Sequence, residues 1–193
     1  MSENPKRGAA ELRDTERKRA PKSKPSRPVQ VRRNFKAART AFSRLAYINF
    51  PQGSGAMWLS LDYKIFADQI GRYPTLDESR EYYQQYVRLL RRLYKENGAE
   101  LVYMYVRHRG RRAGRIQYHM LISKPPTASV GMRDMWESIA ELWEVGFCHL
   151  RQLHYINGRI DGLINIFFPE YIDLTWHGSN NLKREKNDTR ERE

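Results

Sequence analysis

Two strand-like segments joined by a short basic turn constrain the fold of this chain more than any other feature. Residues 101–107 are rich in Val and Tyr, and residues 115–122 alternate between apolar and polar side chains. Such alternation is typical of a β-strand with two different faces. The intervening residues 107–115 are dominated by Arg and Gly, which suits a tight connection. The sequence therefore predicts an antiparallel hairpin.

The second strand of this hairpin carries polar side chains on one face. Gln117 and His119 are two residues apart, so they project together, and His108 at the end of the first strand lies within reach of them. Side chains at positions i and i+2 of a rigid strand can offer converging lone pairs to a divalent cation. An amide oxygen suits Mg or Mn, the expected ions, whereas the imidazoles also allow Zn, Co or Ni. The alternative is a polar strand face turned to solvent, with a structural histidine.

The remaining patterns complete an α+β domain. A Thr-x-x-Glu capping box at Thr75 opens a helix that Gly98 ends, and its tyrosines recur at the helical spacing of core residues. Periodicity predicts further helices over residues 32–47, 132–143 and 160–168, and strands over residues 57–63 and 147–153. The order helix, strand, helix, strand, strand, helix, strand, helix indicates a mainly antiparallel sheet with helices packed on it.

Charge points to the class of partner. The 193 residues include 35 Lys and Arg against 22 Asp and Glu, a formal net charge of +13, which favours a polyanion such as nucleic acid, although an acidic membrane surface could also attract this charge. Residues 1–31 combine many cations with three prolines and few large apolar side chains, so we expect a disordered basic arm. Residues 184–193 are expected to form a charged flexible tail, which leaves residues 32–183 as one folded domain.

Targeting signals and cysteine chemistry narrow the class further. No apolar run is long enough to span a membrane, and the first residues are too charged for a signal peptide, so we expect a cytoplasmic protein without a membrane partner. Cys148 is the only cysteine and lies in an apolar segment, so it is expected to be a small buried hydrophobe rather than a nucleophile.

Several segments together resemble the rolling-circle replication initiators of the HUH endonuclease superfamily, in the branch found in small phages and plasmids. The resemblance covers residues 32–183 and rests on the order and spacing of six motifs. These are Asn34-Phe35 through Phe42-Ser-Arg-Leu45, Asn49-Phe50, Trp58-Leu-Ser-Leu-Asp-Tyr63, Val102-Tyr-Met-Tyr-Val106 before Gly114-Arg-Ile-Gln-Tyr-His-Met-Leu-Ile122, Leu142-Trp-Glu-Val-Gly146, and Ser179-Asn-Asn-Leu182.

The resemblance implies a ferredoxin-like or RRM-like HUH core and a nickase activity in rolling-circle DNA replication. A metal held by strand histidines and a carboxylate polarises a scissile phosphate, and a tyrosine attacks it to leave a 5′-phosphotyrosine and a free 3′-hydroxyl. Expected partners are single-stranded DNA or an origin hairpin, and the resemblance allows a host helicase. The nucleic-acid-binding candidates are Arg32, Arg33, Arg109, Arg111, Arg112 and Arg115.

The chain departs from the family pattern at each part of that mechanism. Gln117 stands at a histidine position, and His108 stands where the family has an acidic residue; Asp62, at the end of the preceding strand, is a candidate carboxylate or a solvated strand end. Ile166 stands at the position of the nucleophile, so Tyr171 is the nearest candidate and Tyr155 a distant second. The alternatives are therefore an active nickase with a shifted site, a relative that binds DNA without cleaving it, and a basic structural protein of a virion or nucleoprotein.

Overall fold

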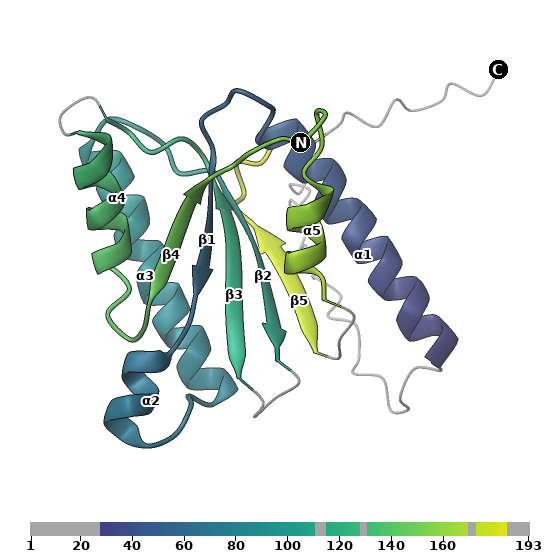
Figure 1. Ribbon diagram of the computed structural model, residues 1–193, viewed down its shortest axis with the longest axis horizontal. Coiled ribbons are helices and arrows are strands. Elements are labelled where there is room, and N and C mark those ends of the chain that lie inside the picture. The colour runs from purple at the N-terminus through teal and green to yellow at the C-terminus, as the bar shows by residue number, and fades with distance from the viewer. Residues whose placement is uncertain (1–27, 111–114, 128–130, 170–172, 185–193) are drawn as a thin grey trace, which may run out of the picture.

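A five-stranded antiparallel sheet forms the centre of the protein, with helices on both faces (Figure 1). The computed structural model describes residues 28–110, 115–127, 131–169 and 173–184. The strands are β1 (Met57–Leu61), β2 (Tyr103–Arg109), β3 (Ile116–Ile122), β4 (Cys148–Gln152) and β5 (Leu174–Gly178). The helices are α1 (Pro28–Asn49), α2 (Lys64–Ile70), α3 (Leu76–Glu96), α4 (Met132–Glu141) and α5 (Asp161–Phe167).

The strand order β4-β1-β3-β2-β5 arises from two interlocked β-α-β units. Both β1 and β2 pair antiparallel with β3, so the chain crosses from β1 to β2 through α2 and α3. In the same way β3 and β4 both pair antiparallel with β1, and α4 connects them. This is the ferredoxin-like arrangement, extended by β5 at the outer edge of β2. The predicted α+β class with a mainly antiparallel sheet is confirmed.

The structure contains every predicted element and adds α2 and β5. Both additions are short, and their sequences lack a clear apolar period, which is why the pattern did not reveal them. Helix α1 begins at Pro28 and so includes the last residues assigned to the basic arm. The rest of the arm, and all but the first residue of the predicted tail, lie outside the described residues.

Each face of the sheet is covered by a different pair of helices. The larger core lies between the sheet and α3 and α4, and includes Leu59, Leu61, Tyr83, Tyr86, Leu90, Tyr118, Met120, Ile139 and Trp143. The second core lies beneath α1 and α5, and includes Phe42, Ala46, Met104, Val106, Leu121, Ile164 and Phe167. The α3 tyrosines are therefore core and half-core residues, as their spacing predicted.

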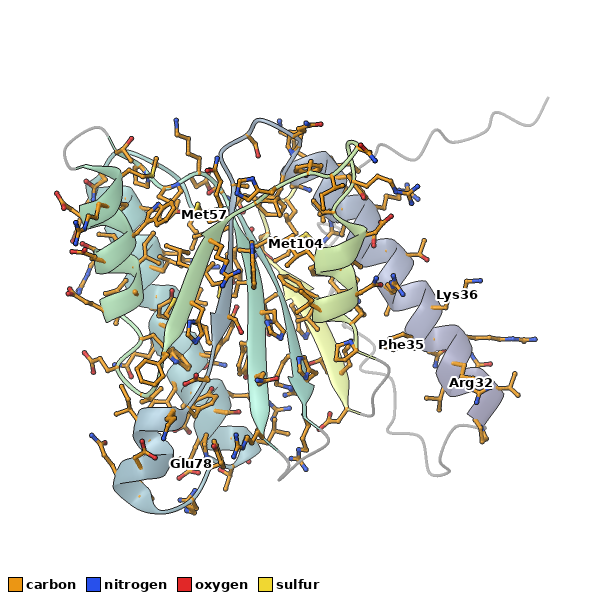
Figure 2. All side chains as sticks on the ribbon, viewed as in Figure 1. Arg32, Phe35, Lys36, Met57, Glu78 and Met104 are labelled. Carbon is orange, nitrogen blue, oxygen red and sulfur yellow. The ribbon has the colours of Figure 1, made fainter. Side chains whose placement is uncertain are left out.

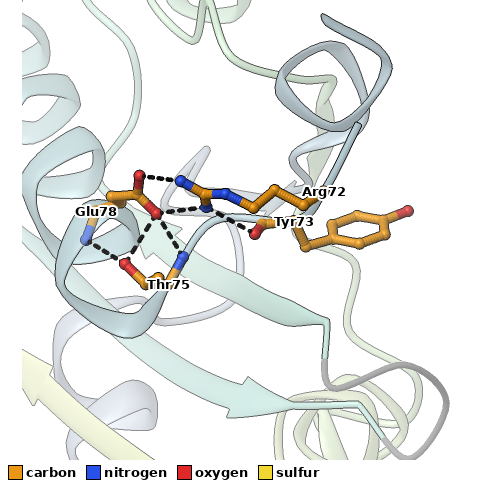
Figure 3. A network of polar contacts seen from close by, with 4 residues as sticks. All are labelled: Arg72, Tyr73, Thr75 and Glu78. Carbon is orange, nitrogen blue, oxygen red and sulfur yellow. Dashed lines mark hydrogen bonds and ion pairs between the residues drawn. The ribbon is translucent and has the colours of Figure 1, made fainter. Parts of the chain in front are cut away.

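A polar network fixes the first turn of α3 (Figure 3). The Glu78 backbone N–H donates to the Thr75 hydroxyl at 3.3 Å, and the Thr75 backbone N–H donates to the Glu78 carboxylate at 2.7 Å. The Arg72 guanidinium adds two hydrogen bonds of 2.8 Å to the same carboxylate. The capping box predicted from Thr75 is confirmed, and a fork-shaped ion pair reinforces it.

The stability of the protein is expected to depend on pH through this cap. The Arg72 guanidinium and the two Thr75 hydrogen bonds lower the pKa of the Glu78 carboxyl from 4.5 to about 2. A carboxyl with a lowered pKa in the folded protein stabilises the fold above its ordinary pKa, and this stabilisation is lost as pH falls toward the folded pKa. Glu78→Gln should therefore lower the thermal unfolding midpoint at neutral pH and differ less from wild type between about pH 4.5 and about pH 2. Circular dichroism melts measure this.

Glu81→Gln is the matched control, because Glu81 lies exposed on the same helix. That variant should follow wild type at every pH. A Glu78→Gln difference that stays constant across the acid range would contradict the cap as the origin of the effect.

The turn that follows α4 holds the end of β1. The Trp143 indole N–H donates to the Asp62 carbonyl oxygen at 2.6 Å, and the Phe147 backbone N–H donates to the Asp62 carboxylate at 2.9 Å. Gly146 lies so close that a Cβ there would stand 2.0 Å from the Asp62 carbonyl oxygen. The Trp-x-x-Gly sequence thus builds a clamp on Asp62, which fixes where β1 ends.

Candidate nucleic-acid and metal site

The hairpin of β2 and β3 brings the three predicted metal ligands onto one face of the sheet, which we call the histidine face. His108 pairs with Gln117 in the strand register, and His119 follows two residues later on the same side. The Nε2 atoms of His108 and His119 are 2.9 Å apart, and their rings stack with centroids 5.0 Å apart. His108 and His119 therefore form a direct pair, with Gln117 beside them.

Both histidines are neutral in this environment. Each is only 6% exposed. Burial lowers the pKa of His108, and burial together with the neighbouring His108 lowers the pKa of His119 to about 3. Neutral imidazole is the form that binds metals. The His119 Nδ1 atom is buried and has no hydrogen-bond partner in the part of the chain that the structure describes.

Helix α5 covers one side of the pair. The Phe167 ring stacks on His119, with centroids 5.2 Å apart and planes 20° apart, and Phe167 is itself fully buried. Ile166, the residue at the position of the family nucleophile, is 51% exposed and belongs to the outer surface of the helix. The hydrocarbon ring of Phe167 therefore occupies the space above the pair, and none of the α5 residues carries a hydroxyl.

The tyrosine candidates lie elsewhere. Tyr171 is outside the described residues. The Tyr155 hydroxyl donates to the Phe50 carbonyl oxygen, and burial raises the pKa of Tyr155. Cys148 is also structural, because burial raises the pKa of its thiol to about 11. A thiol with such a pKa is a poor nucleophile near neutral pH.

Carboxylates do not complete a metal site around the pair. Among the described residues no three His, Cys, Asp or Glu side chains cluster as metal ligands. Asp62 lies on the histidine face, but one of its carboxylate oxygens accepts hydrogen bonds from the backbone N–H groups of Lys64 and Phe147. Its other oxygen is 4.0 Å from the His149 Nε2 atom. Asp62 thus anchors the clamp rather than standing as a solvated strand end.

The donor set fits a borderline ion better than a hard one. Two neutral imidazoles with an adjacent amide, and no negative charge, match the preferences of Zn, Co or Ni, whereas Mg and Mn favour carboxylates and water. The unpartnered His119 Nδ1 could carry the proton that Nε2 ligation requires, although it lacks the supporting acceptor that metal-bound histidines usually have. His108 and His119 would hold the ion, with Gln117 as the third ligand.

The β4 side of the histidine face is accessible. His149 and Arg151 are exposed there because Cys148 and Leu150 turn toward the larger core. The Arg151 guanidinium lies over the Trp58 ring, 5.9 Å from its centroid, and Phe147 is 48% exposed. Helices α1 and α5 stand over the β2 and β5 side instead (Figure 1). Sequence reasoning missed this surface, although the alternation of residues 147–153 contained the signal.

The predicted basic residues occupy several positions. Arg32 and Arg33 are exposed on α1, which contains no acidic residue, and Figure 2 shows Arg32 and Lys36 on its outer side with Phe35 turned inward. Arg115 lies over the Tyr73 ring at 4.6 Å, and Arg109 is 3.9 Å from Asp173. Arg111 and Arg112 are outside the described residues.

Comparisons with known proteins identify the family. None of the helices formed by the described residues is both long and apolar enough to cross a lipid bilayer. Searches of curated proteins and of solved structures gave no match. The sequence model of one family, described as a replication-associated protein of the ORF2 type, matches residues 56–160, more than half of the chain, from the start of β1 to the residue before α5. The chain therefore belongs to this family of replication-associated proteins.

Proposed function

We propose that this protein acts in DNA replication by binding single-stranded DNA, or the single-stranded part of an origin hairpin, on its histidine face. The observation that carries the proposal is the continuity of the histidine pair with the exposed surface of β4. A strand lying there would meet aromatic rings for stacking and a guanidinium for its phosphates. The residues of this surface are Trp58, Phe147, His149 and Arg151.

Helix α1 supports the same proposal through its charge. Arg32, Arg33 and Lys36 are exposed within little more than one helical turn. Like charges at such spacing repel one another, and a polyanion relieves that repulsion. The basic residues of the preceding arm would add affinity that does not depend on base sequence.

The activity that we propose for this site is nicking and rejoining of the strand in an HUH-type reaction. His108, Gln117 and His119 would hold a divalent ion, which supplies Lewis-acid polarisation of a phosphate oxygen when bound. The Tyr171 phenol oxygen would bond to phosphorus as the bond to the 3′ oxygen breaks. The phenol proton would leave and the 3′ oxygen would gain one, which yields a 5′-phosphotyrosine and a free 3′-hydroxyl.

A second candidate is a relative that binds DNA without cleaving it. The stacking of Phe167 on His119 favours this candidate, because hydrocarbon fills the space from which an α5 hydroxyl would approach. The family match also ends before α5, so it does not include the segment in which the nucleophile is expected.

A covalent-adduct assay separates the two candidates. Wild-type protein incubated with a pool of single-stranded oligonucleotides and Zn, Co, Ni, Mn or Mg is expected to give a slowly migrating band on a denaturing gel. Tyr171→Phe should abolish the band, because phenylalanine has no oxygen to form the ester. Tyr155→Phe is the matched control and should retain it.

The outcomes are distinct. If no metal and no oligonucleotide gives an adduct while binding persists, the nicking proposal is wrong and the second candidate stands. Arg151→Gln should weaken binding to single strands, because it removes the guanidinium beside Trp58. If this variant binds as tightly as wild type, the location on the histidine face is wrong.

A further inference from the structure

A small cavity lies on the face of the sheet away from the histidine pair. It has a volume of about 110 Å³ and opens between α3 and the edge formed by β2 and β5. We call it the edge cavity. Its lining residues are Arg80, Tyr83, Gln84, Tyr105, Arg107, Tyr118, Thr175 and His177.

The lining of the edge cavity is rich in hydrogen-bond donors, and the described residues contribute no carboxylate to it. Two guanidiniums, from Arg80 and Arg107, stand among hydroxyl, amide and imidazole groups. Guanidinium groups and hydroxyls together are the usual recognition set for phosphate and related oxyanions. A neutral or cationic ligand would leave these charges without compensation.

Arg107 is held in place but incompletely paired. Its side chain is only 7% exposed, and the ion pair that it makes within the described part of the chain is 3.4 Å long, to the Asp173 carboxylate. Asp173 is itself half exposed and also lies 3.9 Å from Arg109. A guanidinium has five N–H donors, so this long contact leaves Arg107 able to bind a further acceptor.

Two further groups prepare the wall of the cavity. Thr175 pairs with Arg107 in the register of β5 and β2, which places its hydroxyl beside the guanidinium on the same face. The Tyr83 hydroxyl is buried without a hydrogen-bond partner among the residues that the structure describes, and burial keeps its pKa well above its usual value. The wall therefore includes a protonated phenol whose hydrogen-bonding need is unmet.

We propose that the edge cavity binds a phosphate-sized oxyanion. Its volume admits several water molecules, so one tetrahedral anion fits. Arg107 and His108 are consecutive on β2 and therefore point to opposite faces of the sheet. The bound anion is thus distinct from a phosphate at the histidine pair, and the inference does not rest on the nicking reaction. The anion could be free phosphate or a phosphate group of a nucleic acid.

Thermal unfolding in phosphate tests the proposal. At constant ionic strength, replacing chloride by inorganic phosphate should raise the unfolding midpoint of the full chain in a saturable manner. Thr175→Val keeps the branched shape and the charge but removes the hydroxyl, and Arg80→Gln removes one cation. Each variant is expected to bind phosphate about tenfold more weakly, because a hydrogen bond to a charged group is lost. Asp173→Asn should bind phosphate more tightly, since it removes the competing carboxylate.

Matched charge changes elsewhere exclude a general effect of net charge. Asp68→Asn and Arg133→Gln alter exposed ion pairs on α2 and α4 and should leave phosphate binding unchanged. A midpoint that does not saturate with phosphate, or that shifts equally in Thr175→Val and wild type, would overturn the proposal. Equal effects of Asp68→Asn and Asp173→Asn would overturn it as well.

A competition arm distinguishes the two sources of the anion. If a single-stranded oligonucleotide abolishes the phosphate-dependent shift of wild type, and Thr175→Val weakens binding of that oligonucleotide, the site binds a nucleic-acid phosphate. If phosphate and the oligonucleotide bind independently, the site binds free phosphate. Either result supports the oxyanion site, whereas the adduct assay described above reports on the histidine face alone.

Discussion

Replacing Gly146 with alanine is expected to lower the free energy of unfolding by about 3 kcal/mol or more. The added Cβ would stand 2.0 Å from the Asp62 carbonyl oxygen, 2.5 Å from its carbonyl carbon and 2.7 Å from its carboxylate. Two of these atoms are backbone, so a side-chain rotation cannot relieve the clash. Relief requires the turn to move away from β1, which breaks the indole hydrogen bond of Trp143. Urea unfolding followed by circular dichroism measures the loss.

Gly162→Ala is the matched control for this prediction. Gly162 lies in α5, and nothing stands within 4 Å of a Cβ added there. Alanine favours the helix by about 0.5–1 kcal/mol over glycine, so this variant should be slightly more stable than wild type. A Gly146→Ala protein as stable as Gly162→Ala would show that the clamp on Asp62 does not hold the end of β1.

Salt is expected to have the largest effect on nucleic-acid binding. We infer that about five phosphates are contacted, by Arg32, Arg33, Lys36, Arg115 and Arg151. For a single strand, five contacts predict that affinity falls about hundredfold between about 50 mM and about 200 mM NaCl, because counterions released on binding must be displaced. Fluorescence anisotropy of a labelled oligothymidine, titrated at several salt concentrations, measures the slope.

The contribution of α1 can be read from that slope. A variant with Arg32, Arg33 and Lys36 changed to Gln should reduce the logarithmic salt slope by about 2. Arg92→Gln with Arg133→Gln removes exposed cations that already pair with Glu96 and Glu137 on their own helices, so it should leave the slope nearly unchanged. Equal slopes in the two variants would exclude α1 from the interface.

Local sequence signals predicted the elements that local interactions specify. The α3 helix followed from the Thr75 capping box, and the alternation after residue 115 gave the β3 strand with its two faces. The α2 helix and the β5 strand were missed because they are short and depend on partners distant in sequence. Trp176 of β5, for example, packs its ring edge-on against Phe42 of α1.

The same distinction applies to the candidate site. The hairpin spacing was sufficient to predict that His108, Gln117 and His119 share a face, and the register confirms this placement. The surroundings of the pair could not be predicted. Nothing near His119 in the sequence indicates that Phe167 will stack on it, because that contact requires α5 to cross the sheet. The roles of the three residues in metal binding, and of Tyr171 in catalysis, stay predictions.

The strand order also sets the sequence of events in folding. The hairpin of β2 and β3 joins neighbouring residues, and its loop closes at little entropic cost. Strand β1 pairs with β3 on one side but meets its other neighbour, β4, only across most of the domain, as Met57 pairs with Gln152. Long-range pairings of this kind slow folding. During synthesis, β1 therefore keeps an unpaired edge until β4 has left the ribosome, and this interval is when the chain is most exposed to aggregation.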